Sequence, residues 1–220
     1  LVCLVGSEMC IRDRCTVDPY TGSVYLTLTN NTSRTDETNA ANPRLNNKFG
    51  HVIRWDESEA ASDFTWDIFV FGSPANGDAD TNRSSLTDMN QFASPDGLAF
   101  DPRGILWIQT DNGADEVTSY TNDQMLAVVP SKLTDENGTQ EVVSADNQAE
   151  LKRFFVGPNG CEVTGFTISP DYKSLFVNIQ HPGNWPYSTD AAEETPSGVS
   201  VRPRASTVVI RREDGGEIAV

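Results

Sequence analysis

One unit of sequence occurs three times along this chain. Each copy has a short apolar run, a turn that contains proline, and a second run that carries an aromatic residue. The copies read CTVDPYTGSVYLTLTN (15–30), LAFDPRGILWIQTDN (98–112) and FTISPDYKSLFVNIQ (166–180). Proline fixes φ for the turn, and the second runs are rich in the β-branched and aromatic residues that pleated strands prefer. The repeat predicts three antiparallel hairpins, with Tyr25, Trp107 and Phe176 at equivalent places on the second strands.

Two further strand-like stretches follow each hairpin. They lie at 51–57 and 64–72 in the first unit, at 124–130 and 151–157 in the second, and at 206–212 and, as a weaker match, 217–220 in the third. The only helical element that the sequence suggests is a short turn within 146–153. Four antiparallel strands repeated in series are typical of a β-propeller, whereas a sandwich would not explain the recurring proline turn. We therefore expect an all-β fold: three four-stranded blades of a six-bladed β-propeller ring, whose other blades lie outside this chain.

The charge balance of the chain is strongly acidic. Sixteen Lys and Arg stand against 32 Asp and Glu, which gives a formal net charge of -16. Nucleic acids and anionic membranes are bound through clustered Lys and Arg, so this balance predicts neither as a partner. The apolar runs are also shorter than the roughly 18 residues that a membrane span needs. An acidic surface suits multivalent cations, or serves solubility alone.

The first fourteen residues, LVCLVGSEMCIRDR, differ in composition and strand pattern from the remainder. They resemble the translated adapter readthrough that contaminates assembled sequences. We therefore set residues 1–14 apart as an artefactual segment and assign the fold to residues 15–220. On this interpretation Cys3 and Cys10 are not native. The remaining cysteines, Cys15 and Cys161, are too far apart to define a metal motif or a disulfide framework.

Two carboxylates precede the first strands of the second and third units. Asp96 lies in SPDG and Glu162 in GCEVTG, and their positions relative to the aligned prolines differ by an even number of residues. In extended backbone an even offset keeps both side chains on the same face. Converging carboxylates attract hard cations, Ca²⁺ above all. The alternative is that Asp96 caps a turn and Glu162 is a solvated loop acid. The matching position in the first unit falls near Asp13, inside the segment set apart.

The composite motifs SPDG…FDPRG…LWIQTD and EVTG…SPD…LFVNIQHPG, followed by STVVIRREDGG, resemble PhoX-type alkaline phosphatases in order and spacing. The resemblance covers nearly all of residues 15–220. It implies a secreted hydrolase of small phosphomonoesters with Ca²⁺ and Fe³⁺ in a propeller channel, in the periplasm or outside the cell. It also implies that Asp96 and Glu162 are metal ligands. We expect a monomer, and no catalytic nucleophile is assigned.

The chain departs from the family pattern near its N-terminus. The family's iron-binding cysteine and further carboxylates belong to an N-terminal half that this chain does not contain, and IRDR stands where an Arg-x-Glu segment is expected. Residues 1–6 are a short apolar run with no basic region before it, so we expect the export signal to lie outside this chain. The resemblance therefore predicts the C-terminal half of a phosphatase domain, a fragment that is not expected to be active alone.

Four further residues are weaker candidates for the site. His181 in QHPG could bind iron or contact phosphate, although a histidine at a strand end more commonly bonds to the backbone; His51 in FGHVIRW has the same two alternatives. Arg103 in the DPRG turn could clamp a phosphate, but its place between two strands predicts a position away from the metals. Cys161 is expected to be a small buried side chain rather than a thiolate ligand.

Two other functions fit the same fold. A calcium-dependent lactonase or esterase of the six-bladed type would use channel carboxylates with one or two metals and no iron. A non-enzymatic binding propeller would use its rim loops instead. Iron content together with phosphatase activity separates the first alternative from a phosphatase. Tolerance of Asp96→Ala and Glu162→Ala would favour the second.

Overall fold

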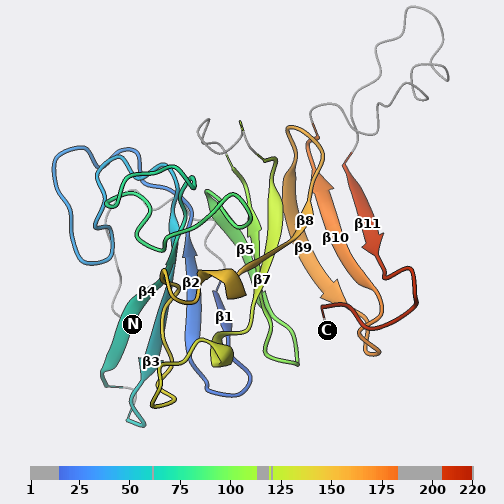
Figure 1. Ribbon diagram of the computed structural model, residues 1–220, viewed down its shortest axis with the longest axis horizontal. Coiled ribbons are helices and arrows are strands. Elements are labelled where there is room, and N and C mark those ends of the chain that lie inside the picture. The colour runs from blue at the N-terminus through green and yellow to red at the C-terminus, as the bar shows by residue number, and fades with distance from the viewer. Residues whose placement is uncertain (1–14, 61, 113–118, 120, 183–204, 220) are drawn as a thin grey trace, which may run out of the picture.

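The computed structural model describes residues 15–60, 62–112, 119, 121–182 and 205–219. Its described residues are almost entirely β-structure, arranged in three antiparallel sheets that lie side by side (Figure 1). The first sheet has the order β1 (Cys15–Val17), β2 (Val24–Leu28), β3 (His51–Glu57) and β4 (Phe64–Phe71). The second has the order β5 (Pro95–Phe100), β6 (Leu106–Thr110), β7 (Gln124–Val128) and β8 (Lys152–Val156). The third contains β9 (Glu162–Ile168), β10 (Leu175–Gln180) and β11 (Ser206–Ile210) in the order β11-β10-β9.

The first strand of each sheet lies against the first strand of the next. Strands β1 and β2 contact β5, and β5 and β6 contact β9. Neighbours in sequence pair antiparallel throughout each sheet. The three hairpins expected from the repeat are therefore β1–β2, β5–β6 and β9–β10, and their leading strands form one continuous line across the molecule.

The three repeat aromatics occupy equivalent places, as predicted. Tyr25, Trp107 and Phe176 are each the second residue of the second strand in their sheet. Tyr25 and Trp107 are completely buried. The Tyr25 ring meets those of Phe69 and Phe100 edge-on, with centroids 5.1 and 5.2 Å apart, so it joins the first sheet to the second. Trp107 joins the second sheet to the third, because its ring meets that of Phe154 edge-on at 4.9 Å and lies 5.6 Å from that of Phe166 in β9.

The proline turns have a shared hydrogen-bonding pattern. The carboxylates of Asp18 and Asp101 each accept bonds from two backbone N–H groups of their own turn. The turn then needs one residue at positive φ, which Gly22 and Gly104 supply at φ +80. The third turn places Tyr172 there at φ 55. The repeat is thus a turn chemistry as well as a strand pattern.

Two expectations about secondary structure need correction or refinement. The weak fourth strand at 217–220 is wrong for the described part of that range: the N–H of Ile218 donates to the carbonyl of Tyr172, and Ile218 is 1% exposed in the core. The segment thus folds back under the third sheet instead of pairing with β11. The helical turn expected within 146–153 is confirmed as a 3₁₀ turn at Gln148–Glu150, and a second such turn spans Pro130–Lys132.

Residues 1–14, including Asp13, Cys3 and Cys10, lie outside the described residues. In the described part of the chain, no helix has the length and apolar character that crossing a membrane requires.

Candidate metal centre

One end of the second and third sheets collects the candidate residues. In β5–β6, Pro95 pairs with Thr110; in β9–β10, Glu162 pairs with Gln180. These pairs stand at the beginning of the first strand and the end of the second, so they mark the same rim. Asp111 follows β6 directly and His181 follows β10 directly. Because β6 contacts β9, the two hairpins present these side chains to each other.

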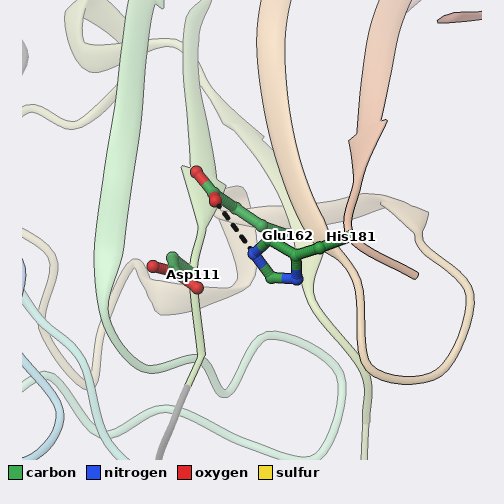
Figure 2. A group of neighbouring side chains, drawn as sticks. All are labelled: Asp111, Glu162 and His181. Atoms are coloured by element: carbon green, nitrogen blue, oxygen red, sulfur yellow. Dashed lines mark ion pairs between the residues drawn. The ribbon is translucent and has the colours of Figure 1, made fainter. Parts of the chain in front are cut away.

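Asp111, Glu162 and His181 form a compact group of metal-ligating side chains (Figure 2). One ligand atom from each lies within 4.8 Å of the other two. The carboxyl group of Glu162 and the ring of His181 point toward one another, with Oε2 and Nε2 3.4 Å apart. Glu162 is buried, Asp111 is half-buried and His181 is exposed. The group therefore has a buried floor and a side open to solvent.

The surroundings of Glu162 disfavour its charge in the absence of a cation. Burial raises the pKa of the Glu162 carboxyl, the negative charge of Asp111 raises it further, and a side-chain hydrogen bond with Asp96 adds to the effect. The charge of His181 lowers it. Gln180 donates a bond of 2.6 Å to the Oε2 atom. Like charges gathered in a partly desolvated place are stabilised by a bound cation, which favours the ionised forms of all of them.

Asp96 is 5% exposed and lies within β5, so it is part of a strand rather than the cap of a turn. Its carbonyl accepts a 2.8 Å bond from Thr27 Oγ1 of the first sheet. Asp96 and Glu162, the two carboxylates singled out from the sequence, are thus brought together, and Glu162 is buried rather than solvated. Their role as metal ligands stays a prediction.

Backbone close to this rim is held in an uncommon conformation. Ser94, two residues before Asp96, has φ 49, and His181 has φ 34. Positive φ is uncommon for residues other than glycine, and such strain tends to persist at functional sites. The N–H of Ser94 donates to the carbonyl of Phe49, and its carbonyl accepts from the N–H of Asp111. The strained residue thus ties Asp111 to the neighbouring loop.

Asp123 supports Asp111 from the protein interior. Its carboxylate accepts hydrogen bonds from Thr110 Oγ1, at 2.6 Å, and from the backbone N–H of Asn112. These donors are the residues on either side of Asp111. Burial raises the pKa of Asp123 to about 7 against the opposing effect of the Thr110 hydroxyl, and the charges of Asp111 and Glu162 raise it as well.

Sequence reasoning missed both Asp111 and Asp123. Asp111 stands at the end of the repeat segment LWIQTDN, directly after a predicted strand, and that position was a usable signal. Asp123 stands in TND before an apolar run, where nothing in the local pattern separates it from an ordinary turn residue.

Of the weaker candidates, His51 lies in the core of the described chain. His51 is fully buried; its Nε2 donates to the carbonyl of Ala41 at 2.7 Å, and its Nδ1 accepts from the amide of Asn47 at 3.2 Å. Burial lowers the pKa of His51 to about 4. It is therefore a neutral histidine of the core, bonded to loop backbone.

Arg103 and Cys161 also have other partners. Arg103 pairs with Asp101 at 2.7 Å and donates to the carbonyl of Ile218 at 2.7 Å, at the turn end of β5–β6 that lies opposite the rim. Cys161 is 2% exposed, and burial raises its thiol pKa to about 12, so it behaves as a small apolar side chain.

Comparison with known proteins agrees with the fold and the motifs. Residues 5–183 match the family described as "Alkaline phosphatase PhoX". Among solved structures, the chain is similar to Pseudomonas fluorescens PhoX in complex with vanadate, a transition state analogue. The identity is 38% and the TM-score 0.73, over 93% of this chain and 34% of that one. The chain thus spans about a third of the length of that protein. No curated protein sequence matches significantly.

Proposed function

Because the chain belongs to the alkaline phosphatase PhoX family, we propose that it supplies part of a metal-dependent site that hydrolyses phosphomonoesters. The observation that carries the proposal is the convergence of Asp111, Glu162 and His181 within 4.8 Å, beside Asp96. The structure of the similar Pseudomonas fluorescens protein is a complex with vanadate, a transition state analogue. Vanadate is a phosphate analogue, which favours a phosphoryl group as the part of the substrate that this rim receives.

The donor atoms of this group fit a metal centre. Carboxylate oxygens are the preferred ligands of Ca²⁺, and imidazole nitrogen suits iron. Glu162 is 3% exposed and its pKa is raised by its like-charged neighbours, so the group is costly to ionise without a cation. We propose that Asp96, Asp111 and Glu162 face calcium, and that His181 and one carboxylate face iron. When bound, such metals polarise phosphoryl oxygens and stabilise the charge that develops on them.

Neighbouring residues of the chain orient the proposed metal ligands. Asp123 accepts bonds from the Thr110 hydroxyl and the Asn112 N–H, and so holds the residues on both sides of Asp111. Gln180 fixes the Oε2 atom of Glu162 at 2.6 Å, and the half-open side at His181 leaves an approach for substrate. A phosphate dianion would be repelled by the bare carboxylates, so substrate binding at this rim requires bound cations.

We propose that the three sheets are consecutive blades of a β-propeller. The support is that the leading strands of successive sheets are adjacent, because β1 contacts β5 and β5 contacts β9. In a propeller such strands line the central channel, and the rim at Asp96, Asp111 and Glu162 would be the channel mouth. The proposal includes a monomeric protein located in the periplasm or outside the cell, without nucleic-acid or membrane partners.

Metal and vanadate binding to the 220-residue chain test the proposal. Ca²⁺ and Fe³⁺ would be titrated in turn by calorimetry, followed by vanadate with and without the metals. We expect vanadate binding only after metal loading, and a loss of at least about tenfold in metal affinity for Glu162→Gln. Asp214→Asn, a change at an exposed carboxylate that pairs with Arg212, is the control. If Glu162→Gln bound the metals as tightly as the parent protein, the proposed metal centre would be contradicted.

A further inference from the structure

A second concave site lies on the loops of the first sheet, at the same end of the strands as the metal centre. The loops between β2 and β3 and between β4 and β5 enclose a cavity of about 530 Å³. Both loops gather at the end of the sheet where β3 begins and β4 ends (Figure 1). Its lining includes three basic residues, Arg44, Lys48 and Arg83, and two exposed carboxylates, Asp78 and Asp80. In a chain with a net charge of -16, a cavity in which basic side chains outnumber acidic ones is unexpected from composition.

Arg44 is a buried cation whose hydrogen bonds go to backbone carbonyl groups. It is 8% exposed; its Nη1 donates to the carbonyls of Gly72 and Thr81 at 2.8 Å each, and its Nη2 to that of Gly50 at 2.6 Å. Its Nε has no hydrogen-bond partner. Among the described residues, none of the ion pairs involves Arg44. A buried charge normally has a counter-ion, so this guanidinium lacks the partner that its burial calls for.

Arg83 places a second guanidinium beside the first. Both lie over the ring of Phe71, at 5.0 Å for Arg44 and 5.6 Å for Arg83. Burial, together with the charge of Arg83, lowers the pKa of Arg44 to about 10. The carboxylate of Asp80 is 3.9 Å from Arg83 but is 97% exposed, so it neutralises little of this charge. Two close cations with no buried acid between them form an anion-binding arrangement.

We propose that this cavity binds a tetrahedral oxyanion of the phosphate class, at a site separate from the metal centre. Arg83 and Lys48 contact the anion, and the charge of Arg44 beneath them attracts it. The cavity and the metal centre are neighbours, because Phe49 lines the cavity and its carbonyl accepts the N–H of Ser94, two residues before Asp96. The anion comes either from free inorganic phosphate or from the phosphoryl group of an ester.

Binding of inorganic phosphate in the presence of EDTA tests the proposal without involving the metals. Under these conditions the acidic group at Glu162 repels phosphate, so any saturable binding by calorimetry reports another site. We expect one phosphate per chain, and a loss of at least about tenfold in affinity for Arg83→Gln. Arg83 is partly exposed, and the variant's circular dichroism should match that of the parent. Arg212→Gln removes a similarly exposed arginine that follows β11 of the third sheet, and we expect it to change the affinity less than twofold.

The source of the anion is decided by a parallel titration with glycerol phosphate. Similar affinities for the two compounds indicate an ester, whereas binding of inorganic phosphate alone indicates the free ion. No saturable binding of either compound, or equal affinities of the parent and Arg83→Gln, overturns the proposal. Because the titrations are made in EDTA, that result would leave the proposed phosphatase centre untouched, and loss of the centre would leave this site intact.

Discussion

Glu162 opens β9 and His181 follows β10, yet Oε2 of the first and Nε2 of the second are only 3.4 Å apart. The antiparallel register explains this proximity, because Glu162 pairs directly with Gln180, the residue before His181. One hairpin thus creates a carboxylate–imidazole pair without help from any other sheet. Asp111 is added by the second sheet, so the full group depends on how β6 packs against β9.

His181 should matter more for iron than for calcium. Imidazole is a good ligand for iron and a poor one for Ca²⁺, which prefers oxygen. We expect His181→Gln to weaken Fe³⁺ binding by about tenfold or more and Ca²⁺ binding by less than about threefold, as measured by equilibrium dialysis with metal analysis. Asp111→Asn is the matched comparison and should weaken both. If His181→Gln weakened the binding of Fe³⁺ and Ca²⁺ equally, the assignment of the His181 imidazole to iron would be wrong.

Asp123 should make the metal-free protein less stable as the pH rises. Its pKa in the folded state is about 7, against a usual value of 3.8, so between these limits the folded protein binds more protons than the unfolded chain. The free energy of unfolding then falls with rising pH through this window, by at most about 1.4 kcal/mol per pH unit. Urea unfolding in EDTA between pH 4.5 and 7.5 measures it.

The Asn variant isolates this contribution from the other titrating groups. His51, whose pKa is lowered to about 4, acts with the opposite sign below its usual value of 6.5, but it is present in both proteins. The difference in unfolding free energy between the parent and Asp123→Asn should therefore change steadily from pH 4.5 to 7.5. A difference that does not vary with pH would show that Asp123 titrates normally.

The hairpins could be predicted from the sequence because their determinants are local. A proline turn followed by an aromatic on the next strand fixes register within a few residues, which placed Tyr25, Trp107 and Phe176 correctly. Asp96 and Glu162 could be found for the same reason, since their positions are counted from the aligned prolines. The count assumed regular alternation along extended backbone, whereas the pairing of β5 with β6 shifts register between Pro95 and Leu98. The proximity of the two carboxylates is observed, and their role as metal ligands stays a prediction.

The remainder depends on contacts between distant segments. Asp123 gains its role only where β7 begins beside the end of β6, and the buried position of Arg44 depends on carbonyls from Gly50, Gly72 and Thr81 in two separate loops. The expected strand at 217–220 failed for a similar reason. Ile218 is apolar enough for a strand, but a distant guanidinium, that of Arg103, binds its carbonyl and favours a turn beneath the sheet.

Arg103 should contribute to stability and not to metal binding. Its guanidinium pairs with the fully buried carboxylate of Asp101, lies 4.5 Å from the ring centroid of Tyr172, and binds the carbonyl of Ile218. Removing one partner of a buried ion pair costs about 3 kcal/mol or more. We expect Arg103→Ala to lower the free energy of unfolding by roughly that amount while Ca²⁺ affinity changes less than twofold.

The exposed pair of Arg212 and Asp214 supplies the control for this change. Arg212→Ala should cost less than about 1 kcal/mol, because surface ion pairs contribute little. If Arg103→Ala were as mild as Arg212→Ala, or if it weakened Ca²⁺ binding tenfold, Arg103 would have to be reconsidered as a ligand-binding residue.

Gly50 should be the least replaceable glycine of the loops around the first sheet. It has φ +68, and a Cβ built there would lie 1.9 Å from the carbonyl oxygen of Thr29 and 2.5 Å from that of Leu28. Gly138 has a similar φ of +81, yet a Cβ there meets nothing within 4 Å. Alanine at either position carries the strain of a left-handed residue, about 1 kcal/mol. Only at position 50 does it also collide with backbone, which cannot rotate away as a side chain can.

We therefore expect Gly50→Ala to lower the free energy of unfolding by at least about 2 kcal/mol more than Gly138→Ala, as measured by urea unfolding. Because the Gly50 carbonyl binds Arg44, the same change should also weaken phosphate binding in EDTA. Equal stabilities of the two variants would show that the approach of Gly50 to Thr29 is looser than the structure has it.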